Sequence, residues 1–306
     1  MSQVRLPDAV LAFAERGPEW AAYVDSLPTA FRGLLAEWEL RPGDETWFGY
    51  AAVVVPVTTA DGERAVLKVA YPDQETEHEA LALQHWGGRG AVRLLRADPR
   101  RRAVLLERLE RTDLTTVPDL EACRVVAGLY PLIHVPAPPQ LRTVTSYVGR
   151  WLEPMRALPR DAPIPHRMVE QWLSLVADLT ADPRSTGRIV HCDLHHENVL
   201  AAPEGGWRVI DPQAMSGDVH FELAPMLFNR WEEVAHDVRA GVRRRFHTLV
   251  DEAGLDEDLA RDWVVVRMVL NAYWAIEDAE RLGRPLAAVE RDWITTCLAV
   301  TKAVQD

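Results

Sequence analysis

A polar segment between short apolar runs constrains the fold of this chain more than any other feature. An apolar run leads into the sequence HCDLHHEN at residues 191–198, and the apolar pair VL follows it. A further short apolar segment, residues 207–210, ends at Asp211. Short apolar runs bounded by polar clusters predict strands joined by a loop. We therefore expect a loop that presents Asp193, Asn198 and Asp211 together.

These three side chains suit the transfer of a phosphoryl group. In that reaction one carboxylate positions and deprotonates the attacking hydroxyl, while an amide oxygen and a second carboxylate hold Mg²⁺ against the phosphates. The spacing Asp-x4-Asn, with a histidine two positions before the aspartate, is typical of the catalytic loop of kinases. Asp211 follows Asn198 after a predicted β-hairpin, and this makes the pattern more specific.

Two other interpretations of the segment stay open from the residues alone. Asp, Asn and His often occur in loops because their side chains bond to the local backbone and form turns. The segment also holds four metal-ligating side chains, those of His191, Cys192, His195 and His196. A structural zinc site usually needs paired ligand spacings, and no second Cys/His pair follows here.

Composition narrows the class of protein. A chain of 306 residues suggests one large domain or two lobes around a cleft. Its three cysteines have no paired spacing, which favours a reducing compartment. No N-terminal signal and no apolar run of about 18 residues are present, so we expect a cytoplasmic protein with no membrane partner. The net charge of −12 argues against nucleic acid and favours a cationic small molecule.

The pattern of apolar residues divides the chain into two parts. Strand patterns predict a small antiparallel sheet with one helix between about residues 40 and 109, with strands at 50–57, 65–69, 92–95 and 103–106. Helical periods are predicted for residues 7–38, 75–86, 117–132, 142–157, 166–181, 220–252, 256–281 and 284–304. We predict an α+β fold in which residues 1–109 form N-terminal helices plus a β-rich nucleotide-binding lobe. Residues 110–306 form a helical catalytic and acceptor-binding lobe.

A lysine within an apolar strand gives a second candidate site. Lys68 lies in the run AVLKV, and on the solvent face of an alternating strand it would need no special explanation. Buried there, it would need a charged partner. The helix that follows offers Glu75, Glu77 and Glu79. A strand lysine on the phosphates, paired with a helix glutamate, is part of a kinase active site. We select Glu79 as that partner.

The rest of a nucleotide site is less clearly marked. A loop that covers the phosphates is expected near Gly43 and Gly49, but a complete G-x-G-x-x-G is missing. The absence of any G-x4-G-K-[ST] excludes a P-loop mechanism. Glu107 and Leu109 follow the predicted strand at 103–106, and the backbone there is expected to bind the edge of adenine.

These residues together resemble a known family, the aminoglycoside phosphotransferases. The resemblance rests on the order AVLK68, Glu79, HCDLHHEN, Ile-Asp211-Pro and FELAP at 221–225, and it covers about residues 40–300. The chain is most similar to the branch of streptomycin 6-phosphotransferases and hydroxyurea phosphotransferases. The resemblance implies a two-lobe protein-kinase-like fold, ATP and Mg²⁺ as cofactors, and a small-molecule acceptor.

The resemblance also implies a role for each matching residue. Asp193 is the expected catalytic base, Asn198 and Asp211 the magnesium ligands, Lys68 the phosphate-binding lysine and Glu79 the residue that orients it. His191 is expected to brace the loop.

The sequence departs from the family pattern in two places. Residues 195–197 read His-His-Glu where His-Pro-Gly is common, although the Asp-to-Asn spacing is preserved. Glu222 stands where an aspartate is usual, so its part in supporting the catalytic loop is open.

The acceptor is expected against the C-terminal helices. Arg267, Asn271, Trp274 and Asp278 fall on one stripe of a largely apolar helix, and a polar stripe there indicates either a wet cleft or satisfied core groups. Glu232, Asn271, Trp274 and Asp278 are the candidate acceptor-binding residues. Carboxylates suit guanidinium groups, and an indole ring can stack on a cation.

Our functional prediction is a monomeric phosphotransferase that uses ATP and Mg²⁺ on an alcohol group. A cationic aminoglycoside such as streptomycin is the expected acceptor, and its phosphorylation would confer antibiotic resistance. Hydroxyurea or another small metabolite is the alternative acceptor. A nucleotide-binding regulatory pseudo-enzyme is the alternative in class. The presence of a candidate base argues against it.

Overall fold

A computed structural model describes residues 4–305, which form two compact units. The smaller unit comprises the chain up to Arg111 together with Ala201–Gln213, and the larger comprises Thr112–Leu200 together with the chain from Ala214. The first crossing thus lies two residues beyond the predicted boundary at 109/110. The structure also differs from the predicted division in returning a thirteen-residue segment, 201–213, to the smaller unit.

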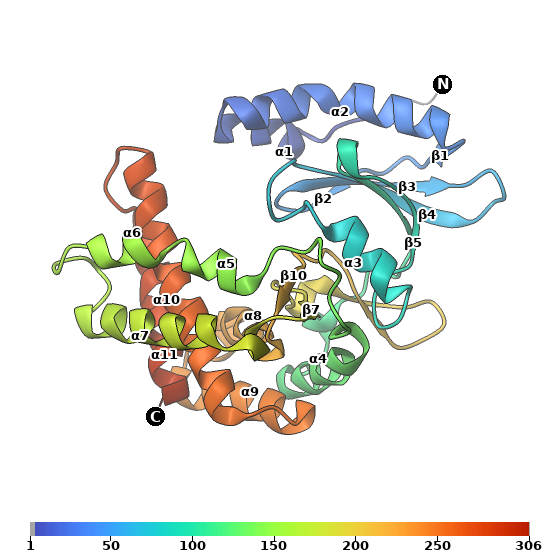
Figure 1. Ribbon diagram of the computed structural model, residues 1–306. Helices are drawn as coiled ribbons and strands as arrows, with labels where there is room; N and C mark the ends of the chain where they lie inside the picture. The colour runs from blue at the N-terminus through green and yellow to red at the C-terminus, as the bar shows by residue number, and fades with distance from the viewer. Residues whose placement is uncertain (1–3, 306) are drawn as a thin grey trace. The chain divides into compact units, whose positions relative to one another are not determined.

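The smaller unit is built on an antiparallel sheet (Figure 1). Its strands run in the order β1-β3-β4-β6-β5, with β2 also paired to β3. They are β1 (Arg41–Pro42), β2 (Trp47–Phe48), β3 (Ala52–Thr58), β4 (Arg64–Ala70), β5 (Leu94–Asp98) and β6 (Ala103–Glu107). Lys68 of β4 pairs with Val54 on one side and Val104 on the other, so it lies at the centre of the sheet.

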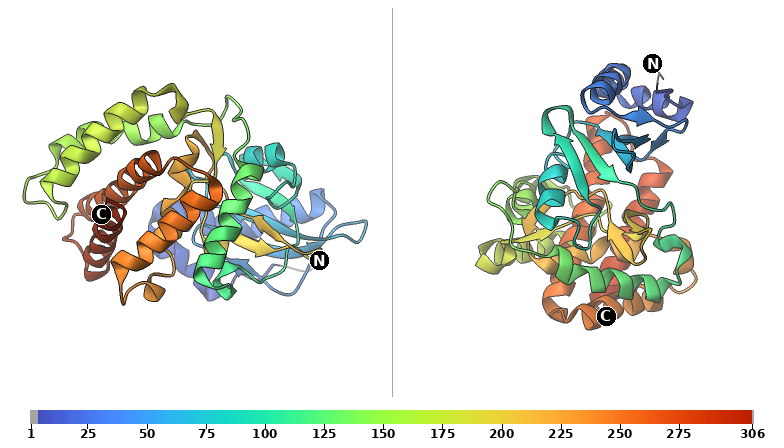
Figure 2. Two further views of the ribbon diagram at one scale, coloured as in Figure 1. Left: turned by 90° about the horizontal axis from the view of Figure 1, so that it is seen from below. Right: turned by 90° about the vertical axis from the view of Figure 1, so that its right-hand side faces the viewer.

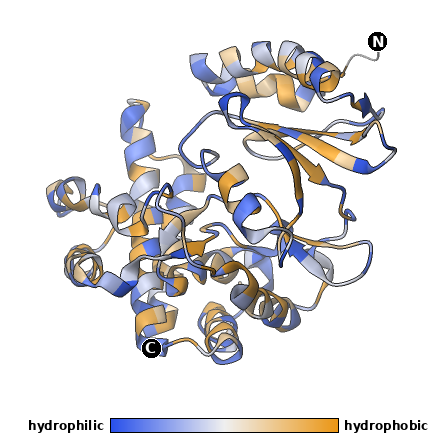
Figure 3. Cartoon of the chain, turned by 45° about the vertical axis from the view of Figure 1, so that its right-hand side comes forward, coloured by the Kyte–Doolittle hydropathy of each residue, from blue (hydrophilic) through white to orange (hydrophobic). Residues whose placement is uncertain are grey.

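Helices pack on both faces of this sheet. The N-terminal elements are α1 (Asp8–Leu11), the 3-10 helix η1 (Ala12–Arg16) and α2 (Pro18–Glu37). Leu27, Phe31 and Leu34 of α2 are fully buried in one cluster with the inward residues of β3, β4 and β6. Figure 3 shows hydrophobic positions along these strands and along α2. Because this apolar stripe continues past Pro28, α2 continues through that proline as one helix.

The helix on the opposite face is α3 (Glu79–Trp86). It begins four residues later than predicted, because the Asp73 carboxylate accepts the backbone N–H groups of Glu75 and Thr76 and forms a turn there. It ends at Gly87, which has φ +57° and closes the helix in the left-handed conformation that glycine favours. Successive strand residues alternate between faces, so Lys68 points to the face that carries α3.

The returning segment is attached to the smaller unit by backbone hydrogen bonds. It contains β9 (Trp207–Val209), whose Val209 forms a parallel bridge with Ala91. The Val209 carbonyl accepts the N–H of Val92, and its own N–H donates to Gly90. At the start of the segment, Ala201 of β8 (Val199–Ala201) accepts the N–H of Glu110. These contacts place Asp211 in the same unit as Lys68.

The larger unit is mainly helical (Figure 2). Its α-helices are α4 (Asp119–Ile133), α5 (Val144–Gly149), α6 (Leu152–Ala157), α7 (His166–Ala181), α8 (Ala224–Phe228), α9 (Val238–Ala253), α10 (Glu257–Arg281) and α11 (Ala288–Gln305). Short 3-10 helices are η3 (Leu114–Thr116), η4 (Pro183–Ser185), η5 (His196–Asn198), η6 (Val219–Glu222) and η7 (Trp231–Glu233), with η2 (Pro99–Arg101) in the smaller unit. Helix α10 is the central one, since residues 263–273 are all buried.

One predicted helical stretch is broken. Residues 220–252 form η6, α8, η7 and α9 in place of a continuous helix. Arg230, between α8 and η7, adopts φ +52°, a conformation that an α-helix cannot include. Asp237 then accepts the N–H of Ala240 and starts α9 as a new helix.

A strand that the sequence analysis did not anticipate supports the catalytic segment. β10 (Met215–Gly217) pairs antiparallel with β7 (Arg188–Val190), the strand that leads into the HCDLHHEN segment. Gly217 is required there, because a Cβ atom would lie 2.6 Å from a methyl group of Val144. Among the helices of residues 4–305, none is long and apolar enough to cross a membrane.

Candidate active site

Three predicted side chains form a charged cluster in the smaller unit. The Lys68 ammonium donates to Glu79 Oε1 at 2.7 Å and to Asp211 Oδ1 at 2.5 Å. Lys68 and Glu79 are buried, whereas the side chain of Asp211 is half exposed. Burial alone would lower the pKa of Lys68, but the carboxylates of Asp211 and Glu79 outweigh it and raise that pKa above its ordinary value. The lysine therefore stays charged beside an accessible carboxylate.

The backbone at Asp211 is held in a special conformation. Asp211 has φ +58°, in the left-handed region that aspartate tolerates better than most residues. It lies two residues beyond Val209, which the smaller unit fixes through two hydrogen bonds. A strained residue at the end of an anchored strand directs its carboxylate to a defined place, as a metal-binding aspartate needs.

The larger unit holds the other half of the predicted set by clamping its backbone. Glu222 is fully buried, and its carboxylate accepts the N–H of His191 at 2.6 Å and the N–H of Cys192 at 2.8 Å. The ring of His134 lies 3.4 Å from the same carboxylate. Burial opposes ionisation of Glu222, yet His134, His191 and the backbone donors lower its pKa. Glu222 therefore supports this loop as a carboxylate, which settles the role that the sequence left open.

The residue before the predicted base is strained. Cys192 has φ +69°, an uncommon conformation for a residue with a Cβ atom. Its N–H is bound by Glu222, and its carbonyl accepts from Arg267 Nη2 at 3.3 Å. Both ends of Cys192 are thus fixed immediately before Asp193, whose side chain is about one-third exposed. Strain maintained by buried charges in this way is common at functional sites.

The remaining loop residues orient Asn198 and Asp193. The Asn198 amide nitrogen donates to the Asp193 carbonyl at 2.8 Å and lies 3.1 Å from His195 Nε2. Because these contacts use the nitrogen, the side-chain oxygen is the atom left for a cation. His191 is fully buried, and its Nδ1 lies 3.4 Å from the N–H of Asp193. These contacts support the predicted bracing role of His191.

The same loop does not gather into a metal centre of the zinc type. Among residues 4–305, no three His, Cys, Asp or Glu side chains are placed to hold one metal ion. Burial raises the pKa of the Cys192 thiol well above its ordinary value, so the thiolate that zinc prefers is disfavoured. His196 instead lies 3.8 Å from Asp119, away from a shared centre.

The predicted phosphate-covering region contains a tight turn, and its role in covering the phosphates stays a prediction. Gly49 lies between β2 and β3, and its N–H donates to Ala52. Open space surrounds the position of its missing Cβ atom. Arg16 of η1 donates to the Tyr50 carbonyl at 2.5 Å, and its guanidinium lies over the rings of Phe13, Trp20 and Tyr50 at 4.2–4.6 Å. The N-terminal helices therefore hold this turn.

The predicted adenine-binding residues lie at the end of β6. Glu107 is half-buried, and its carboxylate accepts the N–H of Arg93 at 2.7 Å. Leu109 is also half-buried. Arg108, between them, lies over the ring of Trp47 at 5.2 Å. Adenine binding by the backbone of Glu107 and Leu109 stays a prediction.

The four predicted acceptor-binding residues differ in their environments. Asn271 is buried and Trp274 half-buried on α10. Asp278 is exposed and pairs with Arg281 at 3.0 Å. Glu232 is exposed in η7, and between residues 4 and 305 no hydrogen bond or ion pair involves it. Of this stripe, Arg267 contacts the catalytic loop, through the carbonyl of Cys192.

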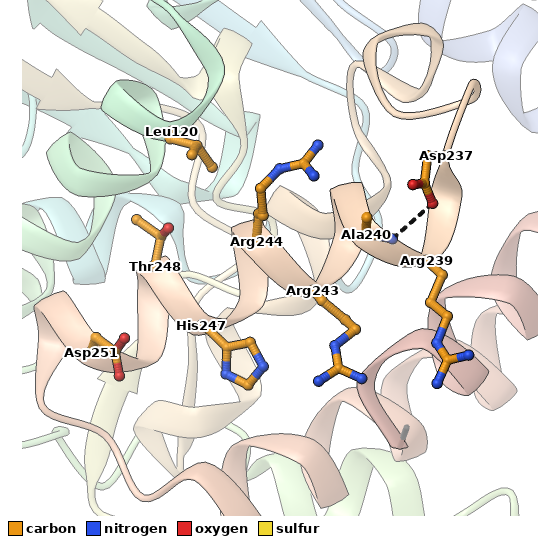
Figure 4. A pocket seen from close by; sticks show the side chains of 9 residues that line it. All are labelled: Leu120, Asp237, Arg239, Ala240, Arg243, Arg244, His247, Thr248 and Asp251. Carbon is orange, nitrogen blue, oxygen red and sulfur yellow. Dashed lines mark hydrogen bonds between the residues drawn. The ribbon is translucent and has the colours of Figure 1, made fainter.

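An open hollow of about 690 Å³ lies elsewhere in the larger unit, along α9 (Figure 4). Several basic side chains line it, among them Arg239, Arg243, Arg244 and His247. None of the predicted catalytic or acceptor-binding residues contributes to it. The hollow therefore lies apart from the residues with the expected chemistry.

Sequence reasoning left two contributors out of the candidate site. Arg267 was recognised as part of the α10 stripe, but its contact with the catalytic loop was not foreseen. His134 carried no signal at all, because its partner Glu222 lies 88 positions away in the chain. For Arg267 a signal existed, since a charged residue within a run of buried apolar residues requires a partner.

Comparison with known proteins identifies the family. The model of the aminoglycoside/hydroxyurea antibiotic resistance kinases matches residues 37–279. The chain belongs to this family. It is 41% identical to a streptomycin 6-kinase of Streptomyces glaucescens, over 90% of this chain and 91% of the relative. It is 38% identical to a hydroxyurea phosphotransferase of Kitasatospora aureofaciens, over 84% of this chain and 76% of the relative. The predicted family and its class, phosphotransferases of small molecules, are confirmed.

Solved structures confirm the predicted kinase-like fold. The crystal structure of the aminoglycoside phosphotransferase APH(4)-Ia is similar with a TM-score of 0.57. The match covers 90% of this chain and 98% of that one, at 18% sequence identity. A thermostable mutant of that protein was crystallised with ADP and hygromycin B, and it matches with a TM-score of 0.54. At these identities the similarity concerns the fold.

Proposed function

We propose that this protein transfers the γ-phosphoryl group of ATP to a hydroxyl group of streptomycin, and thereby confers resistance to it. The observation that carries the proposal is the Lys68–Glu79–Asp211 cluster, in which a buried lysine stays charged beside an accessible carboxylate. Family membership supports streptomycin as the acceptor, because two relatives named streptomycin 6-kinase match about 90% of the chain. The cytoplasm, where ATP is available, is the proposed location.

Each residue has a distinct proposed task. Asp193 accepts the proton of the acceptor hydroxyl as that oxygen forms its bond to the γ-phosphorus, while the bond from phosphorus to the bridging oxygen breaks and ADP leaves. Lys68 neutralises the phosphate oxygens, and Glu79 keeps its ammonium in place. Positioning and charge neutralisation supply the rate enhancement, and no covalent enzyme intermediate is needed.

The donor set fits Mg²⁺. Asp211 offers a carboxylate and Asn198 an amide oxygen, the hard oxygen ligands that Mg²⁺ prefers. The amide of Asn198 bonds through its nitrogen, so its oxygen is not engaged in these contacts, and the left-handed backbone at Asp211 fixes the position of its carboxylate. When bound with ATP, Mg²⁺ supplies neutralisation of charge on the phosphates.

Hydroxyurea is the second candidate acceptor. The 38% identity to a hydroxyurea phosphotransferase favours it specifically, because that relative belongs to the same family and matches most of this chain. The regulatory pseudo-enzyme is disfavoured by the strained, doubly fixed backbone in front of Asp193, which serves no purpose in a module that only binds nucleotide. The monomeric state and the absence of a nucleic-acid partner stay predictions.

The test is Mg²⁺-dependent ADP release with a panel of acceptors. The panel contains streptomycin, other aminoglycosides, hydroxyurea, simple sugars and no acceptor. We expect stimulation by streptomycin at low KM. Stimulation by hydroxyurea alone would replace the acceptor and keep the mechanism. Silence across the panel with ATP still bound would contradict the proposed function.

A further inference from the structure

Arg267 is a buried cation without a carboxylate partner. It is 6% exposed, near the middle of α10. Its single hydrogen bond goes to the carbonyl of Cys192, and its guanidinium lies over the rings of Phe221 and Trp274 at 5.1 and 5.4 Å. Within the described chain its Nε and Nη1 atoms have no partner. Buried charges are normally paired, so these two donors need an explanation.

Other polar side-chain atoms without partners among residues 4–305 occur on α10 and on Trp151, whose ring contacts that of Trp274. One turn further along α10, Asn271 is 5% exposed, and its Oδ1 accepts no hydrogen bond from the described residues. The indole N–H of Trp274 and that of Trp151 are likewise unpartnered there. The two indole rings are 6.3 Å apart and both half-buried, and the ring of Trp274 lies 5.4 Å from the guanidinium of Arg267.

The chemistry of these atoms restricts what can bind. Four donor nitrogens and one carbonyl oxygen are left without partners among residues 4–305. An ammonium or guanidinium group has donors only and would be repelled by Arg267. A carboxylate or phosphate would satisfy the donors but offers no proton to Asn271 Oδ1. Hydroxyl groups both accept from N–H groups and donate to a carbonyl, and each has two acceptor lone pairs, so several neighbouring hydroxyl groups together satisfy the whole set.

We propose that Arg267, Asn271, Trp274 and Trp151 form a subsite for the hydroxyl-bearing part of the acceptor, with the cationic groups of the acceptor outside it. This inference rests on the proposed function, because it places the acceptor beside the catalytic loop. The Arg267 bond to the Cys192 carbonyl ties the subsite to the residue before Asp193. The protein thus binds the acceptor through the acceptor's neutral hydroxyl groups, close to the hydroxyl that reacts.

Substitution of Arg267 and Asn271 tests the polarity of the subsite. With streptomycin as the probe, Arg267→Met should raise the acceptor KM by about tenfold or more, as expected for two lost hydrogen bonds to a charged donor, and leave the KM for ATP within about twofold. Asn271→Asp should raise the acceptor KM as well, because the new carboxylate would pair with Arg267. If the subsite bound cations instead, Asn271→Asp would lower the acceptor KM. The matched control is Arg243→Met, which removes one arginine from α9 and should change neither constant.

A second readout separates this inference from the proposed function. In ¹⁵N-tryptophan-labelled protein, Trp→Phe variants assign the indole N–H signals of Trp151 and Trp274. Streptomycin should shift both signals in the wild type and in Arg243→Met, but not in Arg267→Met. Shifts without phosphoryl transfer would support the subsite and overturn the proposed reaction. Transfer with unmoved signals and an unchanged KM in Arg267→Met would overturn the subsite and keep the reaction, with water then filling these positions. A fall in kcat alone would also overturn it and assign Arg267 to the support of the catalytic loop through the Cys192 carbonyl.

Discussion

The two sets of predicted catalytic residues, one in each unit, are held by different forces. In the smaller unit, Lys68, Glu79 and Asp211 bind one another through their charged side chains. In the larger unit, the loop with Asp193 is fixed by its backbone, through two N–H groups that donate to Glu222. The first arrangement keeps charged groups together, and the second holds the backbone of the Asp193 loop in a fixed conformation. This difference suits a phosphotransferase, in which phosphates need neutralisation and the acceptor hydroxyl needs a base at a defined position.

The largest effect is expected from Asp193→Ala, which removes the base and leaves its backbone support intact. We expect phosphoryl transfer to fall by about three orders of magnitude or more, as for loss of a general base together with its positioning. The affinity for ATP should hardly change, since the Lys68 cluster is untouched. Steady-state kinetics and nucleotide titration measure the two effects. Near-normal turnover would show that Asp193 is not the base.

Lys68→Met removes the ion pairs of the smaller unit. It leaves the buried carboxylate of Glu79 unpaired, and breaking a buried ion pair costs about 3 kcal/mol of stability. The KM for ATP should rise together with a loss of kcat, because the side chain that neutralises the phosphates is gone. Denaturant unfolding and kinetics check both. The double variant Lys68→Met/Glu79→Leu should recover part of the stability without activity, and failure of that recovery would argue against the pairing.

Glu222→Gln tests the backbone clamp. The amide keeps one acceptor oxygen but turns an NH₂ group towards a backbone N–H, so we expect a loss of about 2 kcal/mol for the unsatisfied donor. The kcat should fall more than ATP affinity does, in contrast to Lys68→Met. Equal effects on kcat and on ATP binding would show that the Glu222-supported loop and the Lys68 cluster do not have separate roles.

In the larger unit, the ionised carboxylate of Asp119 should make a pH-dependent contribution of similar size to the free energy of unfolding. Burial opposes ionisation of Asp119, but His196 and Arg245, whose Nε lies 2.9 Å from the carboxylate, outweigh it and lower the pKa of Asp119 to about 2. A lowered folded-state pKa stabilises the protein above the unfolded value and loses that contribution as pH falls through the folded value. Asp119→Asn should therefore cost about 2 kcal/mol at neutral pH.

The same variant has a defined pH window. The difference in unfolding free energy between wild type and Asp119→Asn should shrink between about pH 4 and pH 2 and vanish below it. Denaturant unfolding across this range measures it. A difference independent of pH would show that packing, and not the charge of Asp119, joins α4 to α9.

The smallest effect is expected from Arg16→Ala, which removes the cation that lies among three rings beside the β2–β3 turn. Cation–π contacts at partly exposed sites contribute about 1 kcal/mol, so the KM for ATP should rise only a few-fold. Phe48→Ala, in the same region, is the control for lost packing alone. An unchanged KM for ATP would show that the N-terminal helices do not contribute to nucleotide binding.

Much of the chemistry was predictable because it is local in the chain. The Asp193-to-Asn198 spacing, and Lys68 in an apolar strand with glutamates just beyond it, follow from short segments. What was not predictable depends on distant partners. The clamp on Cys192 joins residues 30 and 75 positions apart, and its left-handed conformation leaves no mark in the sequence. The return of 201–213 to the smaller unit depends on a backbone bridge to Ala91, which no side chain specifies.

The most direct test is mass spectrometry of streptomycin after incubation with ATP, Mg²⁺ and either the wild type or Asp193→Ala. With the wild-type protein we expect a product heavier by one phosphoryl group on a hydroxyl, in amounts equal to the ADP released. With Asp193→Ala, which should still bind ATP, the product should be absent. Release of ADP with streptomycin unmodified, or equal product from both proteins, would contradict the account.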